Sequence, residues 1–338
     1  MSETQGSATD PIAYFLEDIT YQGKTARTRD AYERVLRDFE SYLGSRDLSF
    51  GDANHRDCMA YIHGLRGTVA GSTVATYASY LHRFYDYMVQ VGRFEDNPMT
   101  LVLEEMNESI NTDPARRDIS IPEMRSFIDT VSHPLDRAVL VTLLKTGLRA
   151  GELCNLDMRD LSVPEFPTEQ TTRAQIENRA HSLYVDAEPA AGTEYNGEQR
   201  TASNKRQRAT ILPVDDELAY VLGRWLAIRP DARSPANPVF LSTTDAWGKR
   251  LSPDMVHHLV ERHARRYGWY RDGGGPEENV TPHYFRHFFT THLRDRTGDR
   301  GIVKYLRGDV AQDIIDTYTH DWGDRVRTVY EENMYSIL

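Results

Sequence analysis

Apolar side chains recur at helical spacing through the N-terminal part of the chain. One such stretch runs from Thr25 and stops before Gly44, and a second begins near Ser72. Two shorter stretches, residues 11–17 and 55–65, have the same spacing. Each helix would bury its apolar face against its neighbours. The pattern therefore predicts a unit of four helices.

Beyond this unit the pattern becomes mixed. Residues 104–117 are rich in Asn, Glu, Ser and Asp, as linkers are, and residues 161–198 are polar and interrupted by proline, as loops are. We expect helices at 121–131, 134–146, 255–267, 282–296, 301–306 and 311–318, a helix that begins near Asp215 or Asp216, and strands at 182–185 and 209–214.

The chain is long enough for two domains, because 338 residues exceed what a single core usually serves. We place a helical domain at residues 8–103, a linker at 104–117 and a second domain at 118–338. The expected fold class is mainly α, with a small antiparallel β-sheet in the second domain.

The composition is typical of a folded protein, with 39% hydrophobic and 27% charged residues. No apolar run approaches the roughly 20 residues that span a bilayer. The N-terminus lacks the basic and apolar regions of a signal peptide. Cys58 and Cys154 are too few for a disulfide framework or a cysteine metal site. We expect a cytoplasmic protein with no membrane partner.

The 51 acidic and 40 basic residues give a net charge of −11, which on average argues against a polyanionic partner. Two basic clusters, at residues 24–37 and 261–271, depart from this average. Each could contact phosphates, although a solvated helix face explains either cluster equally well. One hypothesis for the acidic total is a high-salt cytoplasm, as in halophiles, where the Debye length falls to about 3 Å at 1 M salt. The candidate nucleic-acid contacts are Lys24, Arg27, Arg29, Arg34, Arg262 and Arg265.

The helix expected at residues 282–296 has two distinct faces. One face is aromatic, which predicts that it is buried in the core. The other face carries His283, Arg286 and His287. His283 and Arg286 lie together near a helix N-terminus, which favours an anion. His283 and His287 also have the spacing of a zinc pair, but no third ligand is evident, and a surface face with incidental histidines is the plain alternative. We expect no metal.

Two further basic side chains could join Arg286. Arg149 follows Gly147, which ends a helix, and Glu152 lies three residues on, where its carboxylate can hold the guanidinium group. Lys205 enters the second expected strand. Each feature alone has an ordinary explanation, as an ion pair at a helix start or as a solvated lysine at a hairpin tip.

Four features in this order resemble the catalytic domain of the tyrosine recombinase (phage integrase) family, including its Xer-like site-specific recombinases. They are the motif TGLRAGEL, the lysine before the strand, HYFR and the late TYTH. The N-terminal helices resemble that family's SAM-like core-binding domain, so the resemblance covers nearly the whole chain. It implies that Arg149 and Arg286 grip a scissile phosphate. It also implies that His283 is the histidine of H-x-x-R, that Lys205 is the strand lysine and that Tyr318 is the nucleophile.

The resemblance also implies a two-domain clamp around double-stranded DNA, a homo-tetramer on that DNA, accessory recombination proteins as potential partners, and no cofactor. The chemistry suits these residue types, because a phenol with a pKa near 10 is ionised in only about one molecule in a thousand at pH 7. Two arginines can stabilise the charge that grows on the phosphate. His283 could accept or relay a proton, and Lys205 could protonate the leaving 5′ oxygen. The chain would then cut and rejoin DNA through a 3′-phosphotyrosyl link on Tyr318.

One position departs from the family's pattern. Where the family commonly has L-G-H, with the histidine nine residues before the nucleophile, this chain has Asp309. An anion there cannot donate to a phosphate unless it is protonated. We therefore expect Asp309 to turn away, or another group such as His287 or His320 to take the role. The alternative function is a DNA-binding architectural or regulatory protein on the same fold, its catalysis lost.

The tail after residue 324 has apolar residues at roughly helical spacing. It could pack within its own chain. The family resemblance suggests instead that it docks on a neighbouring protomer.

Overall fold

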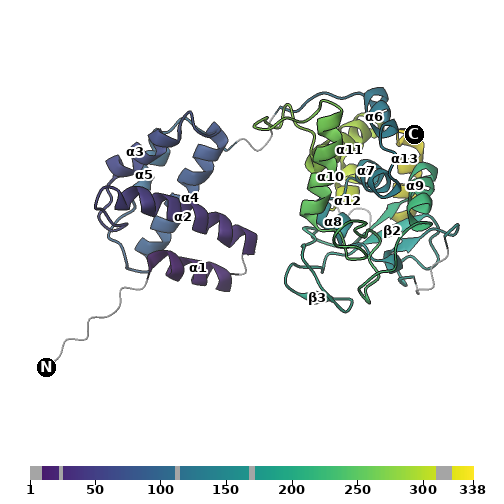
Figure 1. Cartoon of the computed structure of the whole chain (residues 1–338), viewed down its shortest axis with the longest axis horizontal. Helices are drawn as coiled ribbons and strands as arrows, with labels where there is room; N and C mark the ends of the chain where they lie inside the picture. Colours follow the sequence, from purple (N-terminus) through teal and green to yellow (C-terminus); the bar gives the residue numbers. More distant parts are fainter. Residues whose placement is uncertain (1–9, 23–25, 111–114, 167–171, 310–321) are drawn as a thin grey trace. The chain divides into compact units, whose positions relative to one another are not determined.

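The chain divides into two compact units, Met1–Pro114 and Ala115–Leu338, and each has its own hydrophobic core (Figure 1). The expected fold class, mainly α with a small antiparallel β-sheet, is confirmed. The computed structural model describes residues 10–22, 26–110, 115–166, 172–309 and 322–338.

The first unit is built from short helices, and the four expected ones are all present. A further helix, α5, was not expected, because its 7 residues are too few to show a periodic pattern. It takes up the first two residues of the stretch expected as a linker. The helices are α1 (Pro11–Tyr21), α2 (Ala26–Gly44), α3 (His55–Leu65), α4 (Gly71–Gln90) and α5 (Met99–Glu105).

Aromatic rings fill the core of the first unit. The ring of Phe15 in α1 meets those of Tyr32 in α2 and Phe84 in α4 edge to face, each at 5.4 Å between centroids. This is a favoured geometry for aromatic pairs. Cys58 of α3 lies fully buried in the same core, and burial raises the pKa of its thiol to about 12. The thiol is therefore a packing group rather than a reactive one.

The second unit contains the strands and the remaining helices. A three-stranded antiparallel sheet has the order β1-β2-β5, and β3 pairs with β4 in a separate hairpin. The elements are α6 (Ile121–Asp129), α7 (Pro134–Thr146), α8 (Ala150–Cys154), a 3₁₀ turn (Met158–Asp160), β1 (Leu161–Ser162), β2 (Ser182–Val185), β3 (Glu194–Tyr195), β4 (Glu198–Gln199), β5 (Thr210–Pro213), α9 (Asp216–Leu226), α10 (Pro253–Arg266), α11 (Pro282–Thr297), α12 (Arg300–Arg307) and α13 (Trp322–Asn333).

Helix α7 is the centre of the second unit. Nearly all of its residues are buried, which is typical of a helix surrounded by other elements. Helices α9 and α11 pack against it (Figure 1). The helix ends at Gly147, whose φ of 63° is left-handed. This turn directs the next residues toward the α11 side of the unit, because the ring of Phe289 in α11 lies against Gly147.

Buried ion pairs hold the polar segment that the sequence predicts as a loop. Glu198, in the segment, accepts from Nη2 of Arg250 at 2.5 Å, and Arg200 and Arg250 both donate at 2.7 Å to Asp157, just before the segment. Arg173 donates from Nε to Asp160 at 2.5 Å. Buried charges persist only where their partners compensate them. The segment is therefore tied into the unit, and it forms the extra short strands that periodicity did not predict.

The C-terminal tail packs on its own unit. The hydroxyl of Tyr335 donates to the carbonyl oxygen of Leu144 at 2.5 Å, and that of Tyr330 donates to the carbonyl oxygen of Lys145 at 3.0 Å. The buried ammonium of Lys145 in turn donates to the carbonyl oxygen of Tyr335 at 2.7 Å and to Asp215 at 2.6 Å. Of the two expectations for the tail, intramolecular packing is the arrangement in this structure.

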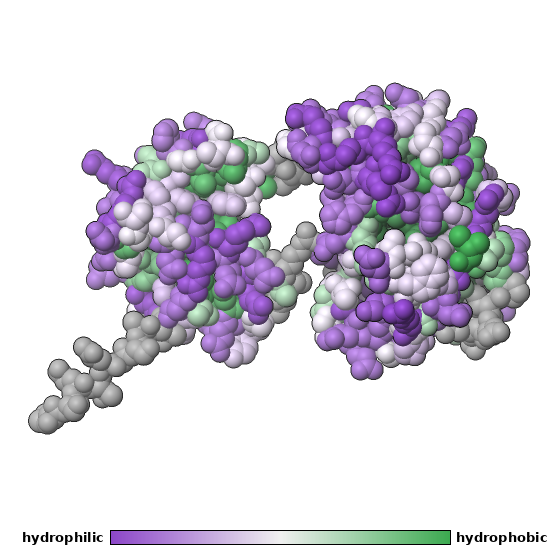
Figure 2. Space-filling view, in the orientation of Figure 1, coloured by the Kyte–Doolittle hydropathy of each residue, from purple (hydrophilic) through white to green (hydrophobic). Residues whose placement is uncertain are grey.

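Hydrophilic residues dominate the face of the molecule drawn in Figure 2, and apolar residues gather there in small patches. Such patches are normal on folded proteins. Across the described ranges, no helix combines the length and the apolar character that crossing a bilayer requires.

Gly147 should not tolerate a side chain. A Cβ atom there would lie 2.4 Å from Cδ1 of Phe289, whereas Gly298 has a similar φ of 65° with open space around it. Gly147→Ala should lower the free energy of unfolding by about 2–4 kcal/mol, and Gly298→Ala by about 1 kcal/mol. Denaturant unfolding of the two variants measures the difference. Equal losses would mean that the clash with Phe289 is relieved without cost.

Candidate active site

Three turns bring charged side chains to one place in the second unit. Arg149 occupies the N-cap position of α8, two residues after the left-handed turn at Gly147. Arg286 lies in the second turn of α11. Gly308, with a φ of 71°, ends α12 and leads into Asp309. The site therefore depends on how α7, α11 and α12 end or begin.

The carboxylate of Asp309 lies at the centre of this cluster. Arg149 donates from Nη2 to Oδ1 at 2.7 Å, and Arg286 donates from Nη2 to both oxygens at 2.9 and 2.8 Å. Nη2 of Arg307 lies 2.8 Å from Oδ2. Hydrogen bonds between ionised groups are the stronger kind. Three guanidinium groups thus converge on one two-oxygen anion.

A second carboxylate, that of Glu152, is fully buried behind the first. It accepts from Nη1 of Arg149 at 3.0 Å and from the backbone N–H of Arg149 at 2.9 Å. The contact that the spacing of Arg149 and Glu152 predicts is therefore present. Nε of Arg206 also lies 3.2 Å from Glu152 Oε1. Glu152 orients Arg149 and compensates a second, buried guanidinium group.

Positive charge exceeds negative charge in the cluster, since four guanidinium groups face two carboxylates. Burial, with Arg149 nearby, lowers the pKa of Arg286 to about 10. Burial also opposes ionisation of Asp309, but the three arginines around it outweigh burial and hold the pKa of Asp309 below its usual range. The cluster is thus suited to holding an anion.

Lys205 and His283 are each connected to one arginine of the cluster, Lys205 by a backbone hydrogen bond and His283 through helix α11. The side chain of Lys205 is exposed, and its backbone carbonyl accepts from Nη1 of Arg149 at 3.2 Å. His283 is in the first turn of α11, one turn before Arg286. The side chain of His283 is exposed, but desolvation by its neighbours, and then the positive charges of Arg116 and Arg286, lower the pKa of His283 below its ordinary 6.5. The imidazole is therefore neutral at pH 7 and able to accept a proton.

The structure brings together Arg149, Glu152, Arg286 and Asp309 from the expected set. Other members of that set, Tyr318, His320 and Lys24, lie outside the described residues, and so does the side chain of Arg27.

The carboxylate of Asp309 faces the arginines in this structure, and the expectation that it turns away from a phosphate stays a prediction. The excess positive charge of the arginines attracts this carboxylate. The other expectation, that His287 or His320 takes the role, stays a prediction. His287 is half-buried, and its ring centroid lies 6.1 Å from that of Tyr284.

Two arginines of the cluster, Arg206 and Arg307, were not expected. Arg206 is buried although its neighbour Lys205 is exposed, because successive side chains of an extended segment point to opposite sides. Arg307 ends α12 just before Gly308. The signal that could have found both is their position within two residues of an expected site residue.

Of the arginines expected to contact nucleic acid, the four with described side chains are exposed, and some are paired with acidic side chains. Arg262 lies 2.6 Å from Asp136, and Arg265 contacts two carboxylates at 2.8 and 2.6 Å. Arg29 and Arg34 have exposed side chains on α2. Exposed pairs of this kind are weak and can open for a phosphate.

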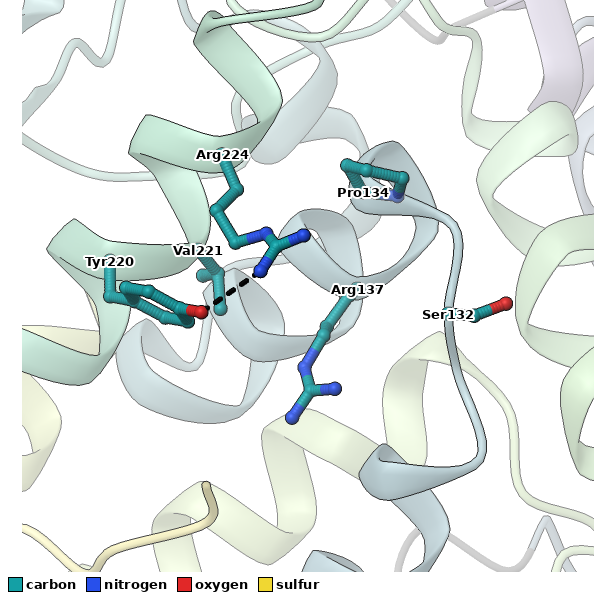
Figure 3. A pocket seen from close by; sticks show the side chains of 6 residues that line it. All are labelled: Ser132, Pro134, Arg137, Tyr220, Val221 and Arg224. Atoms are coloured by element: carbon teal, nitrogen blue, oxygen red, sulfur yellow. Dashed lines mark hydrogen bonds between the residues drawn. The ribbon is translucent and has the colours of Figure 1, made fainter.

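A pocket elsewhere in the second unit contains none of the expected site residues (Figure 3). Figure 3 shows Arg224 directed at Tyr220, to whose hydroxyl it donates a hydrogen bond of 3.0 Å. Among the residues described, no group of three or more His, Cys, Asp or Glu side chains is arranged to hold a metal ion. The pocket is lined by Ser132, Pro134, Arg137, Tyr220, Val221 and Arg224.

The fold and the cluster together define a mostly helical protein of two units with an arginine-rich anion site. Residues 192–323 match the model of the phage integrase family, and residues 12–92 match its N-terminal SAM-like domain. The tyrosine recombinase XerC of Pelotomaculum thermopropionicum is 26% identical over 326 residues, covering 91% of this chain and 92% of the relative. The tyrosine recombinase XerD of Listeria innocua is 27% identical over 330 residues, covering 96% and 97%.

Solved structures share the fold. The Tn1549 transposon integrase in complex with a circular intermediate DNA has a TM-score of 0.66 at 20% identity, over 95% of this chain and 98% of the other. A lambda integrase dimer bound to a COC′ core site has a TM-score of 0.63 at 14% identity, over 93% and 77%. The chain belongs to the phage integrase family and is a tyrosine recombinase.

Replacing Glu152 should destabilise the second unit. Glu152→Gln removes the buried negative charge that compensates Arg149 and Arg206, and breaking such a pair costs about 3–5 kcal/mol. As a control, Glu331→Gln breaks an exposed pair with Arg327 and should cost about 0–1 kcal/mol. Urea unfolding of both variants measures the losses. A loss for Glu152→Gln no larger than the control's would contradict this assignment.

Proposed function

We propose that this chain cuts and rejoins duplex DNA at a specific site through a covalent link between Tyr318 and a 3′ phosphate. The observation that carries the proposal is the convergence of Arg149 and Arg286 on one anion, in a chain that belongs to the phage integrase family. The two non-bridging oxygens of a phosphodiester would accept hydrogen bonds where the carboxylate of Asp309 accepts them in this structure.

The proposed cleavage exchanges one bond from phosphorus to oxygen for another. The phenol oxygen of Tyr318 bonds to phosphorus as its proton passes to His283, and the bond from phosphorus to the 5′ oxygen breaks. Lys205 supplies the proton that the leaving 5′ oxygen requires. Arg149 and Arg286 stabilise the charge on the phosphate oxygens. A 5′ hydroxyl then reverses these steps and reseals the strand without ATP.

The proposed partners are double-stranded DNA and further copies of the same chain. The lambda integrase, similar in fold, is known as a tetramer bound to a Holliday junction, which supports a homo-tetramer on DNA here. We also propose that the chain works in the cytoplasm, that it requires no cofactor, and that accessory recombination proteins are further partners. The named relatives are recombinases, which does not favour a purely architectural role.

The net charge of −11 supports a working environment of high salt. DNA contacts at the exposed arginines of α2 would then be strongly screened, so that recognition relies more on close contacts. We expect solubility and activity to be retained at molar salt. Best activity at low salt, with an intact fold there, would reject a halophilic origin.

The reaction is tested with the DNA site that the chain itself selects. Full-length protein carrying Tyr318→Phe enriches a recognition duplex from a random-sequence library. The unchanged protein is then incubated with a nicked form of that duplex, and denaturing electrophoresis detects a protein–DNA adduct. We expect an adduct with the unchanged protein, none with Tyr318→Phe, and an undiminished amount with Tyr220→Phe, which removes an exposed phenol elsewhere. Specific binding without any adduct would refute the proposed chemistry.

Arg149→Ala should slow adduct formation by about 10²–10³-fold, because it removes a donor to charge that grows in the transition state. Arg29→Ala, in the first unit, should instead weaken binding without slowing adduct formation at saturating protein. Single-turnover kinetics separates the two effects. Equal single-turnover rates for Arg149→Ala and the unchanged protein would contradict the role of Arg149.

The pH profile should report His283. Because desolvation and the neighbouring arginines lower the pKa of His283, its neutral form persists below pH 6.5, and the rate of adduct formation should fall only as the pH drops further. His283→Gln should remove that acidic limb and lower the rate by about 10²-fold or more. A limb unchanged in His283→Gln would assign it to another group.

A further inference from the structure

The contacts between Asp309 and the three arginines bear on how the site binds an anionic substrate, as well as on stability. Arg149 and Arg286 each keep Nη1 on acceptors of the protein and direct Nη2 at Asp309. Arg307 also directs its Nη2 at Asp309. The Arg149 and Arg286 donors that face Asp309 are thus the ones that the proposed reaction assigns to the phosphate.

We propose that the scissile phosphate displaces the carboxylate of Asp309 and takes its place on Arg149, Arg286 and Arg307. Asp309 is then an internal competitor of DNA, and Arg307 is a third phosphate ligand. This inference rests on the proposed function, because it assigns the same arginines to the substrate.

The two anions cannot share the site. A phosphodiester within hydrogen-bonding distance of the same nitrogens would lie close to the ionised carboxylate, and like charges at such separation repel strongly where water is scarce. The three guanidinium groups hold the pKa of Asp309 low, so the carboxylate does not avoid this repulsion by taking up a proton at neutral pH. It has to leave.

The local structure allows the side chain to leave while the backbone stays. The backbone N–H of Asp309 is hydrogen-bonded to the carbonyl oxygen of Lys304 at 3.0 Å. Gly308 packs closely on Arg206, so that a Cβ atom there would lie 2.7 Å from Nη1 of that arginine. The side chain of Asp309 is 27% exposed, which gives it a route to solvent by rotation about its own bonds.

Arg307 is placed to bind the phosphate through a further donor. Its side chain is 29% exposed, and within the described residues its Nε is buried without a hydrogen-bond partner. A buried N–H that lacks a partner is costly, so an additional acceptor would be favourable there. A phosphate offers more acceptor sites than a carboxylate and can satisfy this donor as well.

The competition would make the site selective. A small anion that binds nowhere else on the chain gains only the contacts with the arginines. Asp309 already makes those contacts, so such an anion displaces it poorly. A duplex that is recognised elsewhere on the chain brings additional binding free energy and can displace the carboxylate. Meanwhile Asp309 compensates Arg286, whose side chain is only 2% exposed. The residue therefore stabilises the free protein and opposes weak ligands.

The test uses full-length protein and inorganic sulfate as the probe. Melting temperatures are recorded in sodium sulfate and in sodium chloride at equal ionic strength. Asp309→Asn should melt lower than the unchanged protein in chloride, and its apparent affinity for sulfate should be about tenfold tighter or more. The double variant that carries both Asp309→Asn and Arg307→Leu should lose that gain in sulfate affinity. A sulfate response in Asp309→Asn no larger than that of the unchanged protein would overturn the proposal.

Asp272→Asn is the matched control. It makes the same substitution in a carboxylate that lies 2.6 Å from a single arginine, Arg265, outside the cluster. It should leave the sulfate response unchanged. A response equal to that of Asp309→Asn would mean that any freed arginine binds sulfate, and would refute a site formed by convergence.

A second measurement applies if Asp309→Asn does not fold. Arg307→Leu removes the third ligand and leaves Asp309 in place, so it should slow adduct formation by about tenfold or more, and Arg307→Lys should restore part of the rate. Unchanged kinetics in Arg307→Leu would overturn the role of Arg307.

The outcomes separate this inference from the proposed function. If the Tyr318 adduct forms but Asp309→Asn gains no affinity for sulfate, competition is refuted and the recombinase chemistry stands. If sulfate binds Asp309→Asn tightly but no adduct forms with any variant, the competition between anions stands and the proposed chemistry falls.

Discussion

The buried guanidinium group of Arg286 is the constraint on which the site depends. Its side chain is 2% exposed, so nearly all of its donors need acceptors within the protein. Gly147 and Arg307 provide backbone carbonyls at 2.6 and 2.9 Å, and Asp309 provides a carboxylate. These contacts tie the end of α7 and the end of α12 to α11. The same contacts that satisfy a buried charge also set the geometry of the anion site.

Much of the fold could be predicted from periodicity. The long amphipathic helices α2 and α4 and the aromatic face of α11 bury the side chains that the pattern places inside. The helix α5, of 7 residues, was beyond reach because it is shorter than two turns. The strands β3 and β4, of 2 residues each, are too short to show an alternating pattern, and Glu198 of β4 pairs with the distant Arg250 at 2.5 Å.

The site could be predicted in part. Motif order pointed to Arg149, Arg286 and Asp309, because residue types and spacing along one chain are visible in a sequence. The orientation of Asp309 was not predictable, since it follows from a local excess of positive charge that exists only after folding. Arg307 was missed for the same reason, because Arg149 and Arg286, with which it shares Asp309, are distant from it in the sequence. Sequence therefore indicates which groups are present, and the fold decides which of them face one another.

The central claim is that Tyr318, and no other of the 19 tyrosines, accepts the DNA strand. Peptide mapping of the adduct by mass spectrometry tests this most directly, after the protein is digested by a protease and the DNA is trimmed by nuclease to a short nucleotide remnant. The account predicts the remnant mass on the peptide that contains Tyr318, attached through a phosphate. A remnant on a peptide from any other part of the chain would contradict it.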